Sequence, residues 1–350
     1  MINNTRTIEN ALNMMKYLYP ELSGKRFKNM DISSIDTLDN LYSLIIATWA
    51  NSLAREGLYK EYVEVHGDER TDPKGSIDIQ ETINRQTLLH GSVICNYDEF
   101  SSNIFINIVI KSALQYILNS NDIDLDIKTK VKKAILLYIE VDSQDINNIR
   151  WKTIKYNNSN LRYKHLIEIC KTFIFERKVK KDIGLDDSRR VYLLFKKQLM
   201  KYYFTNYSDK NDVSVFRQPY TLEDEPVFES YINKEQQMIA IKNETQALVI
   251  MIRLEDELMQ KDSTVIRIRL HEFVNYLREY KKENKIKVYG VMMYINIDKT
   301  KLNLQPISIN NISNYLIGET TVDIHDQWKF IDIKLKDAYT YFMDRDTLKK

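Results

Sequence analysis

The feature that most constrains the fold is an uninterrupted apolar segment at residues 247–252. It is far too short to span a bilayer as a helix, and as a strand it would carry apolar side chains on both faces. Such a strand needs cover on both faces, which is typical of a central strand packed beneath helices. A strand is predicted before it at 237–241, and an amphipathic helix at 268–281 and another strand at 288–295 follow it. This order of elements predicts an α/β fold for the C-terminal part of the chain.

The N-terminal half combines helices with one pair of strands. Apolar residues at helical spacing predict helices at about 33–56, 102–118, 127–137 and 162–176. Strands are expected at 59–66 and 76–83, on either side of a polar loop. We therefore expect an α+β N-terminal domain at residues 1–160, built of helices and a β-finger around 59–95, and a C-terminal domain at 161–350.

Composition excludes several classes of protein. Only eight Gly and five Pro among 350 residues argue against β-sandwiches and propellers, which need many tight turns. No glycine-rich phosphate-binding motif occurs, and two Cys with five dispersed His offer no zinc-site spacing. No segment has the apolar length of a signal peptide or a membrane helix. We expect a cytoplasmic protein that contacts no membrane and binds no metal of its own.

Charge is balanced overall but polarised along the chain. The totals are 51 Lys plus Arg and 49 Asp plus Glu, whereas residues 150–218 hold 17 basic and 7 acidic residues, a local net charge of +10. A helix predicted at 189–204 within this segment has a basic, tyrosine-rich side. Basic and aromatic side chains together suit contact with the phosphates of double-stranded DNA, and a solvated face that binds nothing remains the alternative. The candidate DNA-binding residues are Arg189, Arg190, Lys196, Lys197 and Lys201.

Several local motifs resemble one known family. Residues 75–83 read Gly-Ser-Ile-Asp-Ile-Gln-Glu-Thr-Ile, and Tyr-Asp-Glu-Phe follows at 97–100. Near the C-terminus, residues 270–277 read Leu-His-Glu-Phe-Val-Asn-Tyr-Leu, before a strand at 290–294. In this order and spacing the motifs are similar to those of McrC subunits of modification-dependent and related multi-subunit restriction systems. The resemblance extends over nearly the whole chain.

The resemblance implies a partner for the N-terminal half. In this family that region inserts into the ring of an AAA+ NTPase, a McrB-like hexamer that uses GTP or ATP, and stimulates hydrolysis. The residues carried over are Asp78 and, beside it, Lys74 and Ser76; Ser76 stands where the family usually has arginine. The alternative is a hairpin whose charges are simply solvated.

The resemblance also implies a restriction-endonuclease-like C-terminal domain of the PD-(D/E)xK type. Such nucleases hold Mg²⁺ with carboxylates on neighbouring strands and use a lysine two residues after the second carboxylate. The alignment places Met238 and Met251 at the carboxylate positions and Arg253 at the lysine, while Lys196 takes the upstream acidic position. A thioether does not hold a hard cation against water, so we expect no nuclease activity. The alternative is an active Mg²⁺-dependent site with relocated carboxylates from Glu255 and Glu272.

Three hypotheses follow for the function. The first is a McrC-like component of a restriction complex that defends against phage or other foreign DNA, stimulates an AAA+ partner, contacts DNA, and leaves cutting to a separate nuclease subunit. The second is the active endonuclease subunit itself. The third is a stand-alone DNA-binding protein. The sequence predicts neither a recognised DNA sequence nor a methylation dependence.

Overall fold

The computed structural model describes residues 2–28, 30–183, 187–209, 211–217, 237–254, 263–296, 308–312, 315–323 and 328–343. The chain divides into two compact units, which we call the finger unit (residues 23–178) and the sheet unit (residues 1–22 with 179–350). The division falls after residue 178, not after 160 as expected, and residues 1–22 pack with the second unit. Arg177 explains part of this difference, because its buried guanidinium pairs with Asp39 and Asp122 and so holds the first part of its own helix (Lys164–Ile183) in the finger unit.

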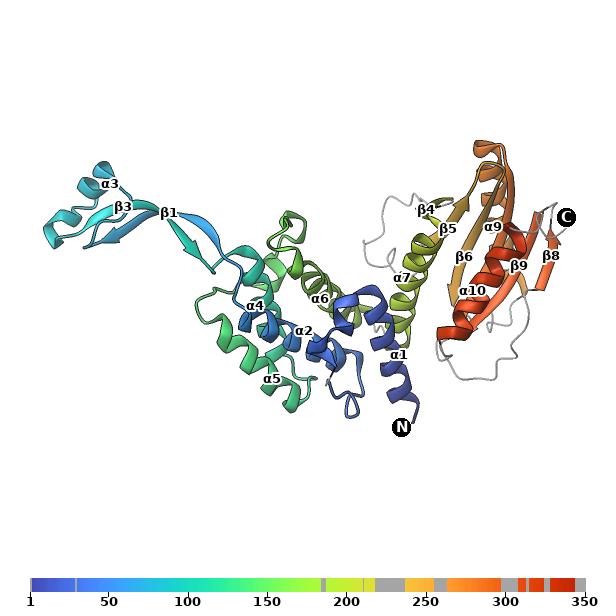
Figure 1. The fold of residues 1–350 in the computed structure, drawn as a ribbon, viewed down its shortest axis with the longest axis horizontal. Coiled ribbons are helices and arrows are strands. Elements are labelled where there is room, and N and C mark those ends of the chain that lie inside the picture. The colour runs from blue at the N-terminus through green and yellow to red at the C-terminus, as the bar shows by residue number, and fades with distance from the viewer. Residues whose placement is uncertain are drawn as a thin grey trace. The chain divides into compact units, whose positions relative to one another are not determined.

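The finger unit has a helical body, shown in Figure 1. Its α-helices are α2 (Leu38–Arg55), α4 (Phe105–Leu118), α5 (Leu125–Ile135) and the first part of α6 (Lys164–Ile183). Thr37 begins α2, since its side chain accepts a hydrogen bond from the Asn40 N–H. Short 3-10 turns of this unit are η2 (Lys25–Phe27), η3 (Thr87–His90), η4 (Leu136–Tyr138), η5 (Ile146–Asn148), η6 (Trp151–Thr153) and η7 (Leu161–Tyr163), and η1 (Pro20–Ser23) lies at the boundary with the sheet unit. The four helices predicted from apolar spacing are confirmed to within a few residues at most ends.

A β-finger projects from this body (Figure 1). Its antiparallel strands β1 (Glu61–Arg70), β3 (Val93–Ser101) and β2 (Ser76–Ile77) lie in the order β1-β3-β2. The strand predicted at 76–83 is wrong beyond Ile77, because the chain turns into helix α3 (Ile79–Asn84). Asp78 begins this helix by accepting the Glu81 N–H, and the Thr82 hydroxyl donates to the Asp78 carbonyl. Capping by these two side chains therefore overrides the strand-like pattern.

The sheet unit is built on a six-stranded mixed sheet in the order β4-β5-β6-β7-β9-β8. Strands β6, β7 and β9 run parallel, and the other pairs are antiparallel. The strands are β4 (Asp212–Arg217), β5 (Gln237–Lys242), β6 (Gln246–Leu254), β7 (Lys287–Asn296), β8 (Ser308–Ile312) and β9 (Tyr315–Asp323). The predicted central strand is confirmed, since β6 lies between β5 and β7 and is buried on both faces.

Among the described residues of the sheet unit, the helices are α1 (Ile2–Leu18), α7 (Asp187–Tyr207), α9 (Ser263–Asn284) and α10 (Trp328–Met343). Helix α9 covers the sheet face that carries Met238 and Met251, and α7 and α10 contact the sheet on the other face. Helices on both faces of a mixed sheet confirm the α/β fold class. Within the described residues, no helix has the length and apolarity needed to cross a membrane.

Candidate functional site

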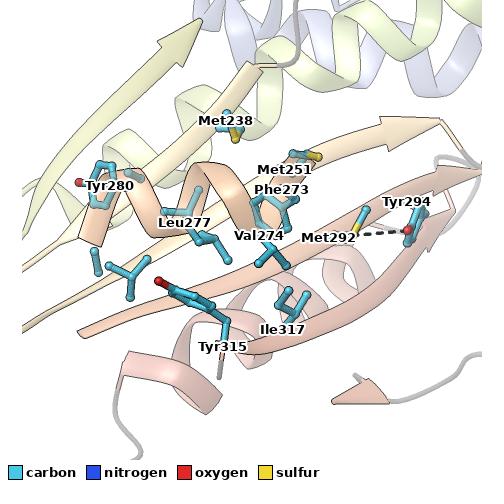
Figure 2. Close-up of a cluster of buried hydrophobic side chains, with 14 residues drawn as sticks. Met238, Met251, Phe273, Val274, Leu277, Tyr280, Met292, Tyr294, Tyr315 and Ile317 are labelled. Atoms are coloured by element: carbon cyan, nitrogen blue, oxygen red, sulfur yellow. Dashed lines mark hydrogen bonds between the residues drawn. The ribbon is translucent and has the colours of Figure 1, made fainter. Parts of the chain in front are cut away.

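Met238 and Met251 lie directly opposite each other on neighbouring strands, as the sequence predicted. Met238 on β5 pairs with Met251 on β6, and Met251 pairs in turn with Met292 on β7. Their side chains are 0%, 1% and 2% exposed. Figure 2 shows this methionine row among apolar side chains, with the Tyr294 hydroxyl donating to the Met292 sulfur at 3.7 Å.

The methionine row is part of a hydrophobic core. Helix α9 supplies Phe273, Val274 and Leu277 to the same cluster. The helix approaches so closely that a Cβ atom added at Gly290 would lie 2.8 Å from Leu277 and Phe273 side-chain atoms. Thioethers in an apolar, solvent-free space are soft, uncharged ligands, so these residues do not fit the Mg²⁺ ion of a PD-(D/E)xK nuclease. Among the described residues, no three His, Cys, Asp or Glu side chains gather so that they could hold a metal.

The structure places the remaining nuclease candidates only in part. Arg253 lies two residues after Met251 on β6 and pairs with Tyr294 through the backbone. Glu272 belongs to α9, and its side chain is not described; Glu255 lies outside the described residues. The proposed rescue of a metal site by Glu255 and Glu272 therefore stays a prediction.

Sequence reasoning missed one carboxylate on this face. Glu319 on β9 pairs with Met292, so it continues the row that runs from Met238 through Met251. Partial burial raises the pKa of the Glu319 carboxyl above its usual value. The sequence contained little indication of this carboxylate. Glu319 is a single glutamate among the nine residues of β9, and the sequence analysis did not predict that strand.

The finger carries the second group of candidates around an open hollow of about 490 Å³. The Lys74 ammonium lies 4.1 Å from the centre of the Tyr97 ring and 3.9 Å from Glu99 Oε1. The hollow is lined by Glu64, His66, Lys74, Gly75, Asn96, Tyr97 and Asp98. The other two candidates instead bond to the backbone: Ser76 Oγ donates to the Asn96 carbonyl, and Asp78 caps α3. Of the three, the structure thus places Lys74 alone in the lining of the hollow.

Tyr97 is the finger residue that sequence reasoning underrated. Its hydroxyl donates to Asp68 Oδ2 at 2.8 Å and accepts from Arg70 at 3.3 Å. The hydrogen bond to Asp68 is the largest of the effects that raise the pKa of Tyr97. The Tyr97 ring also lies beside two cations, Arg70 and Lys74, of which Lys74 lines the hollow.

Gly75 explains why the signature begins with glycine. Its φ angle is +69°, and a Cβ atom there would collide with the Asn96 carbonyl and with Tyr97. Only glycine combines this backbone conformation with such close approach to β3. The glycine therefore brings Lys74 and Ser76 against the neighbouring strand.

The basic helix at 189–204 does not present the surface that its sequence predicted. Arg190 is fully buried and pairs with Asp187, and Lys196 is 7% exposed. Lys201 donates to the carbonyls of Tyr17 and Leu18 at the end of α1, at 3.1 and 2.8 Å. Lys197 is partly exposed, and the side chain of Arg189 is not described. The expectation of an exposed basic face is wrong for Arg190 and Lys196, because α7 packs against both α1 and the sheet.

Comparison with known proteins identifies the family. The family of McrBC 5-methylcytosine restriction system components matches residues 3–201, which is more than half of the chain. The chain belongs to this family. The McrBC match spans α1 to α7 and the finger, and it ends before the sheet that carries the methionine row.

One curated protein and one solved structure are similar to the chain over nearly its whole length. The type IV methyl-directed restriction enzyme EcoKMcrBC of Escherichia coli K12 is 18% identical over 96% of this chain and 98% of its own length. A solved half-complex of the tetradecameric assembly of Thermococcus gammatolerans McrB AAA+ hexamers with bound McrC contains a chain with a similar fold. That match has a TM-score of 0.60 and 13% identity, and covers 98% of this chain and 77% of the other. The resemblance to McrC subunits is confirmed.

Proposed function

We propose that this chain is the McrC-like component of a restriction complex acting on DNA, and that its finger docks on an AAA+ NTPase and stimulates NTP hydrolysis. The chain itself binds no cofactor, and GTP or ATP is used by the partner. The related Thermococcus assembly contains McrB AAA+ hexamers with bound McrC, which supports a partner of this class.

The observation that carries the proposal is the apolar surface of the finger. Within the described part of the chain, eight of the fifteen exposed large hydrophobic side chains lie in the short segment 61–101. They are Tyr62, Val63, Ile77, Ile79, Ile83, Leu88, Leu89 and Phe100. Soluble proteins rarely leave apolar side chains so concentrated in water, and such a surface usually marks a protein interface. A narrow finger with this surface suits insertion into a cavity of a partner.

The polar side of the finger supports a role in hydrolysis. Lys74 is exposed and Arg70 is half-buried, and both cations lie beside the Tyr97 ring. Cations that are already positioned can stabilise charge that develops during phosphoryl transfer, or can orient a partner's catalytic residues. In this proposal Lys74 supplies the charge that the family usually takes from the arginine at the position of Ser76.

We further propose that the sheet unit descends from the PD-(D/E)xK nuclease fold and no longer cuts DNA. The support is the pairing of Met238 with Met251 at the two carboxylate positions, inside a core of buried apolar side chains. Cleavage then requires a separate nuclease subunit.

A complex-formation assay tests the docking. Leu89 and Ile83, which are 77% and 61% exposed, are changed together to Ser, and Leu161→Ser serves as the control because Leu161 is 54% exposed outside the finger. We expect the finger variant to bind the AAA+ NTPase of the same restriction system about tenfold more weakly, or worse, and to stimulate it correspondingly less. Binding and NTP turnover that match those of the control variant would contradict the proposal.

A second candidate function is an active Mg²⁺-dependent endonuclease with relocated acids. Glu319 favours it, because this carboxylate lies on the same sheet face as the two methionines. Cleavage of DNA by the chain alone in Mg²⁺, abolished by E319Q, would establish this alternative.

A further inference from the structure

Helix α5 of the finger unit carries an unusual concentration of lysines. The α5 lysine patch consists of Lys128, Lys130, Lys132 and Lys133. The opposite side of α5 is fixed in the core, since Ile127, Val131 and Ala134 are buried against α2 and α4. The patch therefore faces outward, with Lys128 half-buried and the other three exposed.

The patch lysines outnumber the acids close to them: Asp126 lies four residues before Lys130 on α5, and the Asp31 carboxylate also interacts with Lys130. Within the described part of the finger unit, none of the four lysines forms an ion pair, whereas Arg26, Arg85, Arg162 and Arg177 all do. The neighbouring acid Asp124 is already bound to the Asn40 side chain. The Ser33 N–H and hydroxyl and, to a smaller extent, Lys130 hold the pKa of the exposed Asp31 below its usual value.

Like charges on the patch oppose helix formation. Lys128 and Lys132 are four residues apart, and Lys130 and Lys133 are three apart, so both pairs are neighbours on the helix surface. Each such pair costs a few tenths of a kcal/mol. A bound polyanion would remove this repulsion, which makes the patch complementary to closely spaced negative charges.

We propose that the α5 lysine patch binds the phosphate backbone of double-stranded DNA. The proposal rests on the proposed function, in which the chain works in a complex that acts on DNA. The patch spans about 7.5 Å along the helix axis, which matches contact with successive phosphates of a duplex rather than one small anion. Unlike Arg190, Lys196 and Lys201 of α7, its lysines are free of internal bonds within the described residues.

Binding of the full chain to a fluorescein-labelled duplex, measured by anisotropy over a range of salt concentrations, tests the proposal. Lys130, Lys132 and Lys133 are changed together to Ala, which keeps the helix because Ala is the best helix former. We expect affinity to fall about tenfold or more at moderate salt, and the slope of log K against log salt to flatten by up to about three. A matched control removes three exposed lysines elsewhere in the same unit, Lys25, Lys28 and Lys60, and should change both quantities less. A triple Lys→Arg variant of the patch should keep the affinity.

The outcomes separate this proposal from the proposed function. DNA affinity lost in the α5 variant, with NTPase binding and stimulation kept, supports the patch as a DNA contact. Unchanged DNA affinity and slope overturn it and leave finger docking untouched. Unchanged DNA affinity with loss of NTPase binding would instead make the patch a protein interface, to which the exposed Leu136 and Ile139 beside it would also contribute.

Discussion

Replacement of Met251 tests whether the methionine row is ordinary core. The Met251 side chain is 1% exposed and lies between Met238 and Met292 on the neighbouring strands. Met251→Ala removes Cγ, Sδ and Cε from a packed interior, so we expect the free energy of unfolding to fall by about 2–5 kcal/mol. Met251→Leu nearly preserves volume and should cost less than about 1.5 kcal/mol. Met251→Asp adds an unpaired carboxylate to the same space and should cost more than Met251→Ala.

Hydrogen exchange of the β5 and β6 amides measures these differences locally. A local measurement is needed because a chain of two units need not unfold in one transition. Each variant is compared with the unchanged protein, with and without Mg²⁺. We expect the amides to be protected most in Met251→Leu, less in Met251→Ala and least in Met251→Asp. We expect Mg²⁺ to have no effect on exchange in the unchanged protein. An aspartate variant as stable as the alanine variant, or protection of β6 by Mg²⁺ in the unchanged protein, would refute the assignment of this row to the core.

Two further predictions concern single carboxylates. Asp78→Ala should destabilise α3 by about 1 kcal/mol and reduce stimulation of the NTPase. Asp78→Asn should keep both the stability of α3 and the stimulation, because Asn also caps helices. Loss of stimulation in Asp78→Asn, with α3 still protected from exchange, would show that the charge itself is needed. Burial raises the pKa of Glu319, so the native state binds this proton more tightly than the unfolded state, and stability falls as pH rises from about 4.5 through the native pKa. Glu319→Gln should therefore raise the melting temperature at pH 7 and have little effect at pH 4; equal shifts at both pH values would contradict this.

Most elements predicted from periodicity are present, and the one predicted element of the wrong type has a local cause. The helices near 33–56 and 268–281 and the strand at 288–295 were all found close to their predicted bounds. The strand expected at 76–83 failed because Asp78 and Thr82 bond to nearby backbone and begin a helix. Helices α1 and α10 and the strands β3, β4, β8 and β9 were not predicted. Among these, α1 provides the carbonyls that bind Lys201.

The sequence by itself determined the α/β class, which depends on short-range patterns, and the family resemblance, which depends on the order of motifs. That resemblance in turn implied that Met238 and Met251 lie on neighbouring strands. Only the tertiary structure decided which charged side chains face water. Helical spacing defines the sides of a helix but does not show which segment covers each side. The cover comes from residues that are distant in sequence. For example, Lys201 of α7 donates hydrogen bonds to carbonyls of α1 that lie more than 180 residues earlier in the chain. Because distant segments cover α7, Arg190 and Lys196 are buried instead of forming the predicted basic face. The lysines of α5 have no such cover, and Lys130, Lys132 and Lys133 are exposed.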